Sequence, residues 1–327
     1  MRFLPSISVV AALLSSFAAM AQPAAAPVPP GTCPEVALAN PYLGISTIRL
    51  WPGDAPQANG TGCADIPTLS VMRAHPGREN GSAVIVLPGG SYMGLASILE
   101  GREVADWFAA RGFTAFVLRY RVGKKYLLPV PLIDARRAVQ LVRARARDYH
   151  IAPNRITVVG FSAGGHLAAL SGTQSVPGDP QAEDPIERVS SKPDFLVLGY
   201  PWIGAISPNT AHLTYCKLAD LLDTPGRCEE MQKAYSPDLF VTRDTPPTFI
   251  YHTTTDQTVP VEQALSFYEA LIKAGVSAEM HIFAYGPHGS GLGSGDPALD
   301  QWPNLLENWL RGKGQLSVDA AATSANP

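Results

Sequence analysis

The residues best suited to chemistry lie at positions 160–165, where the run Gly-Phe-Ser-Ala-Gly-Gly contains the pattern Gly-x-Ser-x-Gly. An apolar, strand-like segment at residues 156–159 precedes this run, and a helical segment at residues 166–170 follows it. Between a strand and a helix, the pattern is typical of a serine on a sharp, strained turn that projects its hydroxyl above a sheet. The sequence therefore predicts that Ser162 is a catalytic nucleophile.

A serine hydroxyl needs a base to remove its proton and an acid to orient that base. In the strand–turn–helix arrangement these residues follow in the order Ser, Asp, His, each on a loop after a later strand. Asp256 comes after an apolar strand at residues 248–251, and His288 comes after a further strand at residues 279–284. We expect Asp256 and His288 to complete a catalytic triad with Ser162.

Other histidines and acids fit these roles less well. His166 lies one turn into the helix after Ser162 and is expected to be a packed, hydrogen-bonded residue beneath the site. Asp244 precedes the strand before Asp256, and Glu262 lies in the helix after it, so both are poorer candidates for the acid. The remaining histidines are expected in strands, in solvated loops or at helix ends: His75, His150, His212, His252 and His281.

The tetrahedral intermediate of acyl transfer needs backbone N–H groups directed at its negative oxygen. One should come from Ala163, the residue after the nucleophile. Another should come from the turn Pro-Gly-Gly-Ser-Tyr at residues 88–92, which follows an apolar strand at residues 83–87. We favour the amides of Gly90 and Ser91 for this oxyanion hole; the alternative is a simple Pro-Gly-Gly loop.

Three residues are candidates for lining an acyl or sugar pocket: Tyr92, Met93 and Trp202. Tyr92 and Met93 belong to or follow the oxyanion turn. Trp202 follows an apolar strand at residues 195–198, on the same edge of the sheet as Ser162. The alternative for each of the three is a place in the core.

Strand-like and helix-like runs alternate from about residue 80 onward, which is typical of a parallel α/β sheet. Continuous apolar runs predict strands covered on both faces at residues 83–87, 114–118, 156–160, 195–198 and 248–251. Helical patterns separate them at residues 104–111, 134–149 and 261–274. Two earlier segments, residues 45–51 and 68–73, are expected to be antiparallel edge strands.

These motifs together resemble the α/β-hydrolase fold. The similarity rests on the oxyanion turn, on Glu100-Gly101 opening a helix, and on the runs Leu-Arg-Tyr-Arg at 118–121, Asp-Ala-Arg-Arg-Ala at 134–138 and Gly-Phe-Ser-Ala-Gly-Gly-His-Leu-Ala at 160–168. Within that fold, the chain resembles the secreted carbohydrate esterases of the acetylxylan esterase and feruloyl esterase type, which are related to hormone-sensitive-lipase-like esterases.

The resemblance covers roughly residues 45–312 and implies a mostly parallel, eight-stranded sheet flanked by helices, with no metal or organic cofactor. Relatives usually carry three consecutive glycines in the oxyanion turn, whereas the third position here is Ser91.

The 327 residues, 46% of them hydrophobic, describe a globular protein with a large core rather than a disordered chain. A net charge of −3 does not favour nucleic acid or an anionic membrane as a partner. One domain is expected at residues 41–315, with a less regular insertion around residues 203–240 and a flexible tail at residues 316–327. The arginine-rich helix near residue 140 is expected to be a solvated, ion-paired face, and the glycine-rich residues 289–295 a mobile loop.

The N-terminus predicts a secretory signal peptide at residues 1–21, with Arg2, an apolar stretch and a closing Ala-Met-Ala. The apolar stretch is too short to be a membrane anchor. An Ala/Pro-rich leader follows at residues 22–40, and we expect an exported protein, periplasmic or extracellular.

Four cysteines follow the predicted signal, and an oxidising compartment favours the local pairs Cys33–Cys63 and Cys216–Cys228. Other pairings and free buried thiols are the alternatives. Zinc is not favoured, because the chain has no Cys-x-x-Cys pair.

The sequence thus predicts a secreted serine carboxylic-ester hydrolase acting on a small-molecule or oligosaccharide ester. Its expected substrates are acetyl esters, with feruloyl esters as a further class, of plant-polysaccharide fragments. Two alternatives stay open: a general short-chain esterase on non-sugar esters, and a non-catalytic binding protein with the same fold. A peptidase of the prolyl-oligopeptidase kind is less favoured, because about 80 residues ahead of the first core strand are too few for a propeller.

Overall fold

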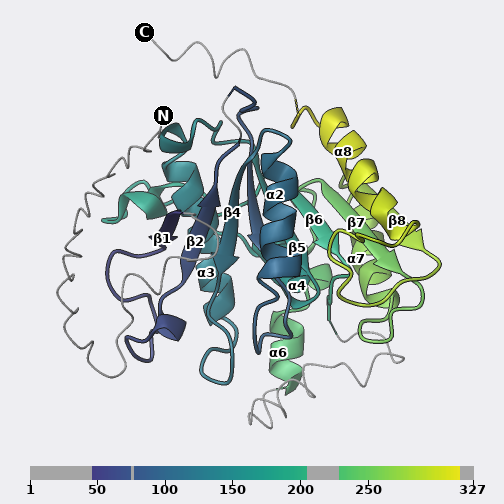
Figure 1. Ribbon diagram of the computed structural model, residues 1–327. Coiled ribbons are helices and arrows are strands. Elements are labelled where there is room, and N and C mark those ends of the chain that lie inside the picture. Colours follow the sequence, from purple (N-terminus) through teal and green to yellow (C-terminus); the bar gives the residue numbers. More distant parts are fainter. Residues whose placement is uncertain (1–45, 75–76, 205–227, 317–327) are drawn as a thin grey trace, which may run out of the picture.

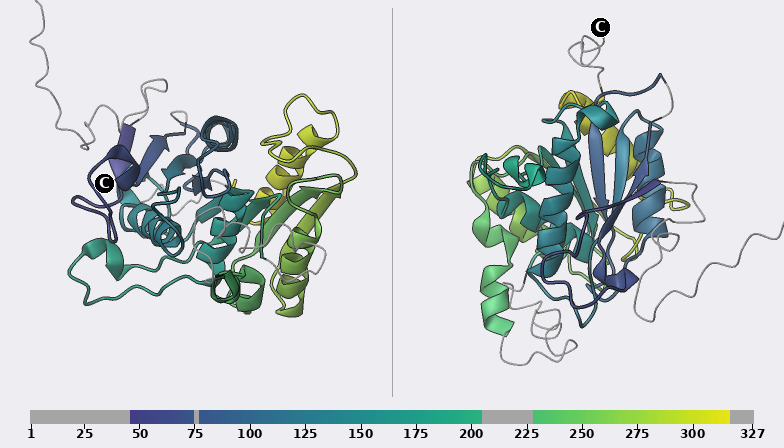
Figure 2. Two further views of the ribbon diagram at one scale, coloured as in Figure 1. Left: turned by 90° about the horizontal axis from the view of Figure 1, so that it is seen from below. Right: turned by 90° about the vertical axis from the view of Figure 1, so that its left-hand side faces the viewer.

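A single twisted sheet runs through the centre of the molecule, with helices packed on both of its faces (Figure 1, Figure 2). The computed structural model describes residues 46–74, 77–204 and 228–316. In this part of the chain the sheet has eight strands in the order β1-β2-β4-β3-β5-β6-β7-β8. The strands are β1 (Ser46–Arg49), β2 (Thr68–Met72), β3 (Ala83–Leu87), β4 (Thr114–Arg119), β5 (Ile156–Phe161), β6 (Phe195–Gly199), β7 (Thr248–Thr253) and β8 (Ala278–Phe283).

The direction of the strands confirms the expected topology. β2 pairs antiparallel with both β1 and β4, while every pair from β4 to β8 is parallel. Every residue of β3 and β5 is buried, as their continuous apolar sequences predict for strands covered on both faces. The outermost strand, β8, is only partly buried, which is consistent with its place at the edge.

The helices divide the core into two layers, one on each face of the sheet. One layer buries side chains of α3, α4 and α7, and the other buries side chains of α2 and α8. The helices are α2 (Glu103–Ala109), α3 (Val130–Ala144), α4 (Ala163–Thr173), α6 (Cys228–Ala234), α7 (Glu262–Lys273) and α8 (Trp302–Gly312). Shorter helical turns are η1 (Cys63–Asp65), η2 (Ile98–Arg102), η3 (Arg147–Tyr149), η4 (Pro185–Arg188), η6 (Pro237–Phe240) and η7 (Leu299–Gln301).

The helix predicted at residues 134–149 differs from the observed α3 at both ends. It begins at Val130, with a proline in its first turn, where the missing N–H of proline costs no hydrogen bond. It ends at Ala144, and the remaining residues form the separate turn η3.

The arginines of this region form the predicted solvated face only in part: Arg145 and Arg147 are exposed, but Arg137 and Arg143 are not. The Arg137 side chain is buried, donates to the Leu50 carbonyl and pairs with Asp184 at 2.6 Å. Arg143 pairs with Asp194 at 3.0 Å and also donates to backbone carbonyls of the segment that leads into β6. The ion pairing is as expected, but these side chains fasten α3 to neighbouring loops instead of facing solvent.

Two of the sequence runs that carry the resemblance meet in a buried ion pair. Asp134 of α3 accepts hydrogen bonds from the backbone N–H and the guanidinium of Arg121, which follows β4. The two side chains are almost fully buried, and desolvation raises the pKa of Asp134 to about 6 even though Arg121 opposes that rise. The pair fixes the position of α3 relative to the end of β4.

Several expectations fall outside the described residues: the signal peptide, the leader, most of the insertion and almost all of the tail. Cys33 and Cys216 also lie there, so both disulfide pairings stay predictions. Within the described segments, no helix has the length and apolar character needed to cross a membrane.

The packing of α4 against β3 generates a prediction. A methyl group at Gly164 would lie 2.1 Å from the carbonyl oxygen of Leu87 and 2.6 Å from that of Pro88. Because both neighbours are backbone atoms, the Gly164→Ala substitution should lower the free energy of unfolding by about 3 kcal/mol. Unfolding in urea, monitored by circular dichroism, measures this.

Gly312→Ala is the matched control. Gly312 is also helical, but no heavy atom lies within 4 Å of the added methyl group. The free energy of unfolding should stay constant or rise by up to about 1 kcal/mol. Equal effects of the two substitutions would show that α4 does not depend on this close approach.

Candidate active site

Ser162 occupies a strained turn between β5 and α4. Its backbone lies at φ 52° and ψ −121°, a conformation that residues with side chains rarely adopt. Phe161 pairs with Gly199 in the sheet register, so the Ser162 N–H reaches the Gly199 carbonyl at 3.0 Å. The Ser162 carbonyl in turn accepts from the N–H groups of His166 and Trp202. These bonds hold the turn that the Gly-x-Ser-x-Gly pattern predicts.

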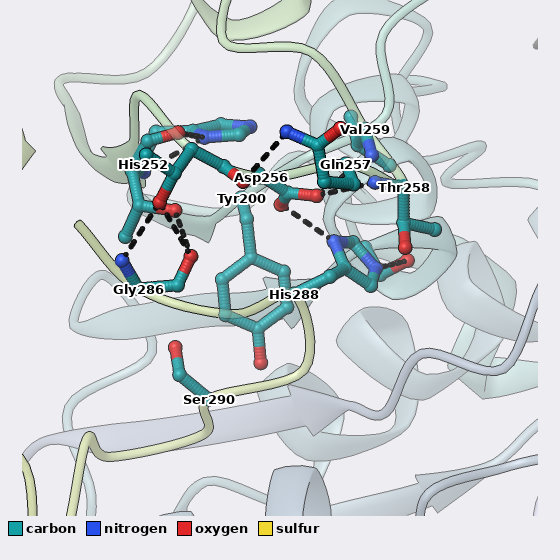
Figure 3. Close-up of polar contacts among 12 residues, drawn as sticks. Tyr200, His252, Asp256, Gln257, Thr258, Val259, Gly286, His288 and Ser290 are labelled. Atoms are coloured by element: carbon teal, nitrogen blue, oxygen red, sulfur yellow. Dashed lines mark hydrogen bonds and ion pairs between the residues drawn. The ribbon is translucent and has the colours of Figure 1, made fainter.

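The structure brings together the three residues expected to form the triad. His288 Nε2 lies 2.8 Å from Ser162 Oγ, and His288 Nδ1 lies 2.7 Å from Asp256 Oδ2. Figure 3 shows the imidazole of His288 turned toward Asp256. An ionised carboxylate can only accept, so Nδ1 carries the proton, and Nε2 is free to accept the hydroxyl proton of Ser162. Ser162 follows β5, Asp256 follows β7 and His288 follows β8, which places all three at the carboxyl ends of parallel strands.

Asp256 is held by more than the histidine. Its Oδ1 accepts the N–H groups of Thr258 at 2.8 Å and Val259 at 2.9 Å (Figure 3). Burial by itself would raise the pKa of Asp256, but the hydrogen bonds from His288 and the two amides outweigh it and hold the pKa below its ordinary value of 3.8. The alternative acids contact neither His288 nor Ser162: Asp244 is exposed, and Glu262 lies in α7.

The oxyanion turn lies against the start of α4. Gly90 has φ 134° and Ser91 has φ 56°, so Ser91 takes up a left-handed conformation despite its side chain. Within the described part of the chain, no hydrogen-bond acceptor takes the N–H groups of Gly90, Ser91 or Ala163. The Gly89 N–H, by contrast, is already bound to the Glu100 carboxylate at 2.7 Å. The predicted set of donors is therefore available, and its role in binding an oxyanion stays a prediction.

The three residues expected to contact substrate differ in exposure. Tyr92 is 4% exposed, Trp202 is 8% exposed and Met93 is 43% exposed. The rings of Tyr92 and Trp202 pack edge to face with their centroids 6.5 Å apart, inside the core layer that includes α4. Both are core residues, which was the alternative for each, and Met93 is the member of this set that faces solvent.

His166 is the packed, hydrogen-bonded residue that its position predicts. Its Nε2 lies 2.7 Å from the carbonyl oxygen of Tyr235, and its Nδ1 lies 2.6 Å from the hydroxyl of Tyr92. A carbonyl can only accept, so Nε2 carries the proton and Nδ1 accepts from Tyr92. Complete burial lowers the pKa of His166 to about 4, and the neutral ring supports the oxyanion turn from below.

The other histidines within the described residues are not part of the site. His252 is buried in β7, His281 pairs with Glu279 on β8, and His150 is exposed. His75 and His212 lie outside the described residues.

Two further side chains join the site that the motifs did not indicate. Glu100 is buried and accepts a hydrogen bond from the Gly89 N–H. Tyr200 packs its ring edge against His288, with the two ring centroids 4.9 Å apart. In the sequence, Glu100 is a single acid at the start of a helix, and that position does not indicate its hydrogen-bond partners. No group of three or more His, Cys, Asp or Glu in the described segments is arranged to hold a metal ion.

The chain is similar to several known proteins. Residues 71–271 match the family profile of BD-FAE. An acetylxylan esterase of Xylanibacter ruminicola is 31% identical over 241 residues, covering 72% of this chain and 46% of that protein. Endo-1,4-beta-xylanase B of Butyrivibrio fibrisolvens is 32% identical over 232 residues, covering 67% of this chain and 35% of that protein. The chain thus spans less than half the length of these two relatives.

A solved structure matches over nearly its whole length. It is the acetyl ester-xyloside bifunctional hydrolase from Caldicellulosiruptor lactoaceticus, with a TM-score of 0.73 and 38% sequence identity. The match covers 83% of this chain and 97% of that chain. The fold is therefore the α/β-hydrolase fold of known esterases.

The burial of His166 generates a prediction about stability and pH. Its pKa is about 4 in the folded state and 6.5 ordinarily, so between these values the unfolded state binds a proton that the folded state does not. This contribution to stability is complete above pH 6.5 and is lost as the pH falls toward 4, by roughly 2 kcal/mol between pH 7 and pH 5.

Urea unfolding of the wild type and of His166→Gln at both pH values measures the effect. The variant should be less stable at pH 7 and should lose less stability on acidification. An equal loss in both proteins would remove His166 as the source.

Proposed function

The chain belongs to the BD-FAE family, and on that basis we propose that it is a carboxylic ester hydrolase that removes acetyl groups from fragments of xylan or related plant polysaccharides. The observation that carries the proposal is the continuous hydrogen-bonded path from Ser162 Oγ through His288 to Asp256. The choice of substrate is supported by the relatives, one named as an acetylxylan esterase and one as an acetyl ester-xyloside hydrolase.

In the first half of the reaction, Ser162 Oγ attacks the ester carbonyl while His288 Nε2 takes its proton. The negative charge moves to the carbonyl oxygen, where the amides of Gly90, Ser91 and Ala163 stabilise it. Asp256 stabilises the imidazolium and keeps the ring oriented. The intermediate then collapses, the bond to the sugar oxygen breaks, and His288 gives its proton to that oxygen, which leaves an acetyl group on Ser162.

In the second half, water takes the place of the sugar alcohol. His288 removes a proton from the water as its oxygen attacks the acetyl carbonyl, and the same three amides again stabilise the oxyanion. Collapse releases acetic acid and returns the proton to Ser162 Oγ. Each proton that His288 accepts is given back, so the enzyme is unchanged at the end of the cycle.

Export and the two disulfide bonds belong to the same proposal. Plant polysaccharides lie outside the cell, so export would bring the enzyme to its substrate, as the segment at residues 1–21 predicts. The pairs Cys33–Cys63 and Cys216–Cys228 would then form in an oxidising compartment.

The triad assignment predicts the effect of four substitutions on the hydrolysis of nitrophenyl acetate. Ser162→Ala and His288→Ala should each lower kcat by roughly 10⁴-fold or more, and Asp256→Asn by a similar factor, because the histidine would lose its orientation. Asp244→Asn is the control and should keep wild-type kcat. Circular dichroism verifies that each variant is folded. Near-normal activity of Ser162→Ala would overturn the assignment of the nucleophile. A greater loss of activity in Asp244→Asn than in Asp256→Asn would show that Asp256 is not the acid of the triad.

The substrate assignment predicts a ranking of esters. The enzyme should release acetate from acetylated xylan and should hydrolyse nitrophenyl acetate faster than nitrophenyl octanoate. Ferulate released from feruloylated oligosaccharides would add a second acyl group. Activity on nitrophenyl acetate without release of acetate from xylan would indicate a general short-chain esterase. Faster hydrolysis of the octanoate would contradict the acetyl specificity as well.

A further inference from the structure

Glu100 is a buried acid in an irregular turn of helix next to the oxyanion turn. It lies in η2, a π-helical turn in which the Arg102 N–H reaches back to the Ser97 carbonyl at 2.9 Å. Its side chain is only 4% exposed. In a single π-helical turn the backbone hydrogen bonds have less favourable geometry than in an α-helix. Such turns are frequent at functional sites, because they redirect one side chain. Here the redirected side chain is a carboxylate that points into the protein, beneath the active site.

One carboxylate oxygen of Glu100 holds the oxyanion turn. Glu100 Oε2 accepts the Gly89 N–H at 2.7 Å, immediately before the Gly90 amide. A methyl group on Gly89 would lie 2.6 Å from this oxygen and 2.9 Å from Ser162 Cβ. Glu100, the oxyanion turn and the nucleophile are therefore packed directly against one another.

The other oxygen reaches the loop that carries the histidine, through Tyr200. Glu100 Oε1 accepts the hydroxyl of Tyr200 at 2.7 Å, and that hydroxyl accepts the N–H of Gly291 at 2.9 Å. The ring of Tyr200 lies against His288 (Figure 3), with the two centroids 4.9 Å apart. Glu100 and Tyr200 thus form a hydrogen-bonded chain between the oxyanion turn and the backbone behind His288.

Further hydrogen bonds hold Gly291, which lies in the glycine-rich segment 289–295 whose mobility stays a prediction. The carbonyl of Gly291 accepts from the Tyr251 hydroxyl at 2.6 Å and from Trp302 Nε1 at 3.2 Å, while its N–H is held by Tyr200. Gly291 also has φ 54°, and a methyl group there would lie 2.9 Å from Leu99 Cγ. Both polar groups of Gly291 are therefore satisfied inside the protein, which ties this residue to Tyr200, Tyr251 and Trp302.

A side chain that only accepts hydrogen bonds suits both partners of Glu100, the Gly89 N–H and the Tyr200 hydroxyl. The Gly89 N–H can only donate, and the Tyr200 hydroxyl, already accepting from Gly291, has its proton left for Glu100. No ion pair among the described residues includes Glu100. Burying a carboxylate without a cation is costly unless hydrogen bonds compensate for the lost water, so Glu100 depends on its bonds from Gly89 and Tyr200.

We propose that Glu100 is a positioning residue for ester hydrolysis. Its carboxylate sets the distance between the oxyanion turn and the His288 loop, with Tyr200 as the second member of the chain. Glu100 touches neither substrate nor the reacting atoms, and it acts through the backbone that carries the oxyanion donors and the base. The inference rests on the proposed function and adds two residues that the triad does not include.

Two substitutions and one control test this proposal. Glu100→Gln keeps the shape and turns one acceptor oxygen into a donor, and Tyr200→Phe keeps the ring against His288 but breaks the chain. The control is Asp194→Asn, whose carboxylate also accepts a backbone N–H, that of Ile156 at 2.9 Å, but at the end of β5 remote from Ser162. The assays are nitrophenyl acetate kinetics and inhibition by a small alkylboronic acid, a mimic of the tetrahedral intermediate.

Misplaced catalytic groups weaken binding of the transition state more than binding of substrate. Glu100→Gln and Tyr200→Phe should therefore each lower kcat by about 10- to 100-fold, with KM within about threefold of wild type. The boronic acid should bind more weakly by a similar factor. The double variant should lose no more activity than Glu100→Gln alone, since both residues act through one chain. Asp194→Asn should lower thermal stability and keep wild-type kcat.

The outcomes separate the two proposals. Wild-type protein that hydrolyses no ester, or hydrolyses it equally well with Ser162→Ala, overturns the proposed function. If activity depends on Ser162 but Tyr200→Phe leaves kcat and boronic acid affinity unchanged, the positioning role of Glu100 and Tyr200 is overturned while the proposed function stands. This test holds even where Glu100→Gln fails to fold. Multiplicative losses in the double variant would likewise show that the two residues act separately.

Discussion

The backbone of Ser162 is held in a conformation that a residue with a side chain rarely adopts, and the surrounding structure must compensate for the strain. A residue in such a region costs about 1–3 kcal/mol and persists only where its neighbours leave it no alternative. At Ser162 these neighbours are the carbonyl of Gly199 and the N–H groups of His166 and Trp202. The sheet register that pairs Phe161 with Gly199 therefore helps to keep the Ser162 hydroxyl directed at His288.

The strained turn at Ser162 also requires the backbone of α4 to approach the backbone at the end of β3 with no side chain between them. Gly164 lets α4 lie against the carbonyls of Leu87 and Pro88, which brings the Ala163 amide next to the oxyanion turn. The Tyr120 hydroxyl donates to the Pro88 carbonyl at 2.6 Å, and Glu100 holds the next residue of that turn. The three amides predicted to bind the oxyanion thus belong to two segments far apart in the sequence that are packed against each other.

Parallel strand order brings the acid and the base to this unit. β5, β7 and β8 end at one edge of the sheet, so the loops that follow them converge. Convergence alone does not orient side chains. Asp256 is oriented by two backbone amides. The His288 loop is tied to the end of β7 by Thr253, whose hydroxyl donates to the Gly286 carbonyl at 3.0 Å. Many short hydrogen bonds between loops replace the rigidity that regular elements supply elsewhere.

The sequence by itself determined the strands and singled out Ser162, Asp256 and His288, which the structure brings together, but it did not indicate helix α8. Continuous apolar runs and the Gly-x-Ser-x-Gly turn are local patterns, and a local pattern can be read without knowing what packs against it. Whether a side chain points inward was decided only by the tertiary structure. Tyr92 and Trp202 are buried together, Arg137 faces a carbonyl instead of solvent, and Glu100 meets Tyr200, 100 residues away in the chain. Each of these depends on partners brought together by the crossing of strands and helices, and a one-dimensional pattern carries no record of such long-range contacts.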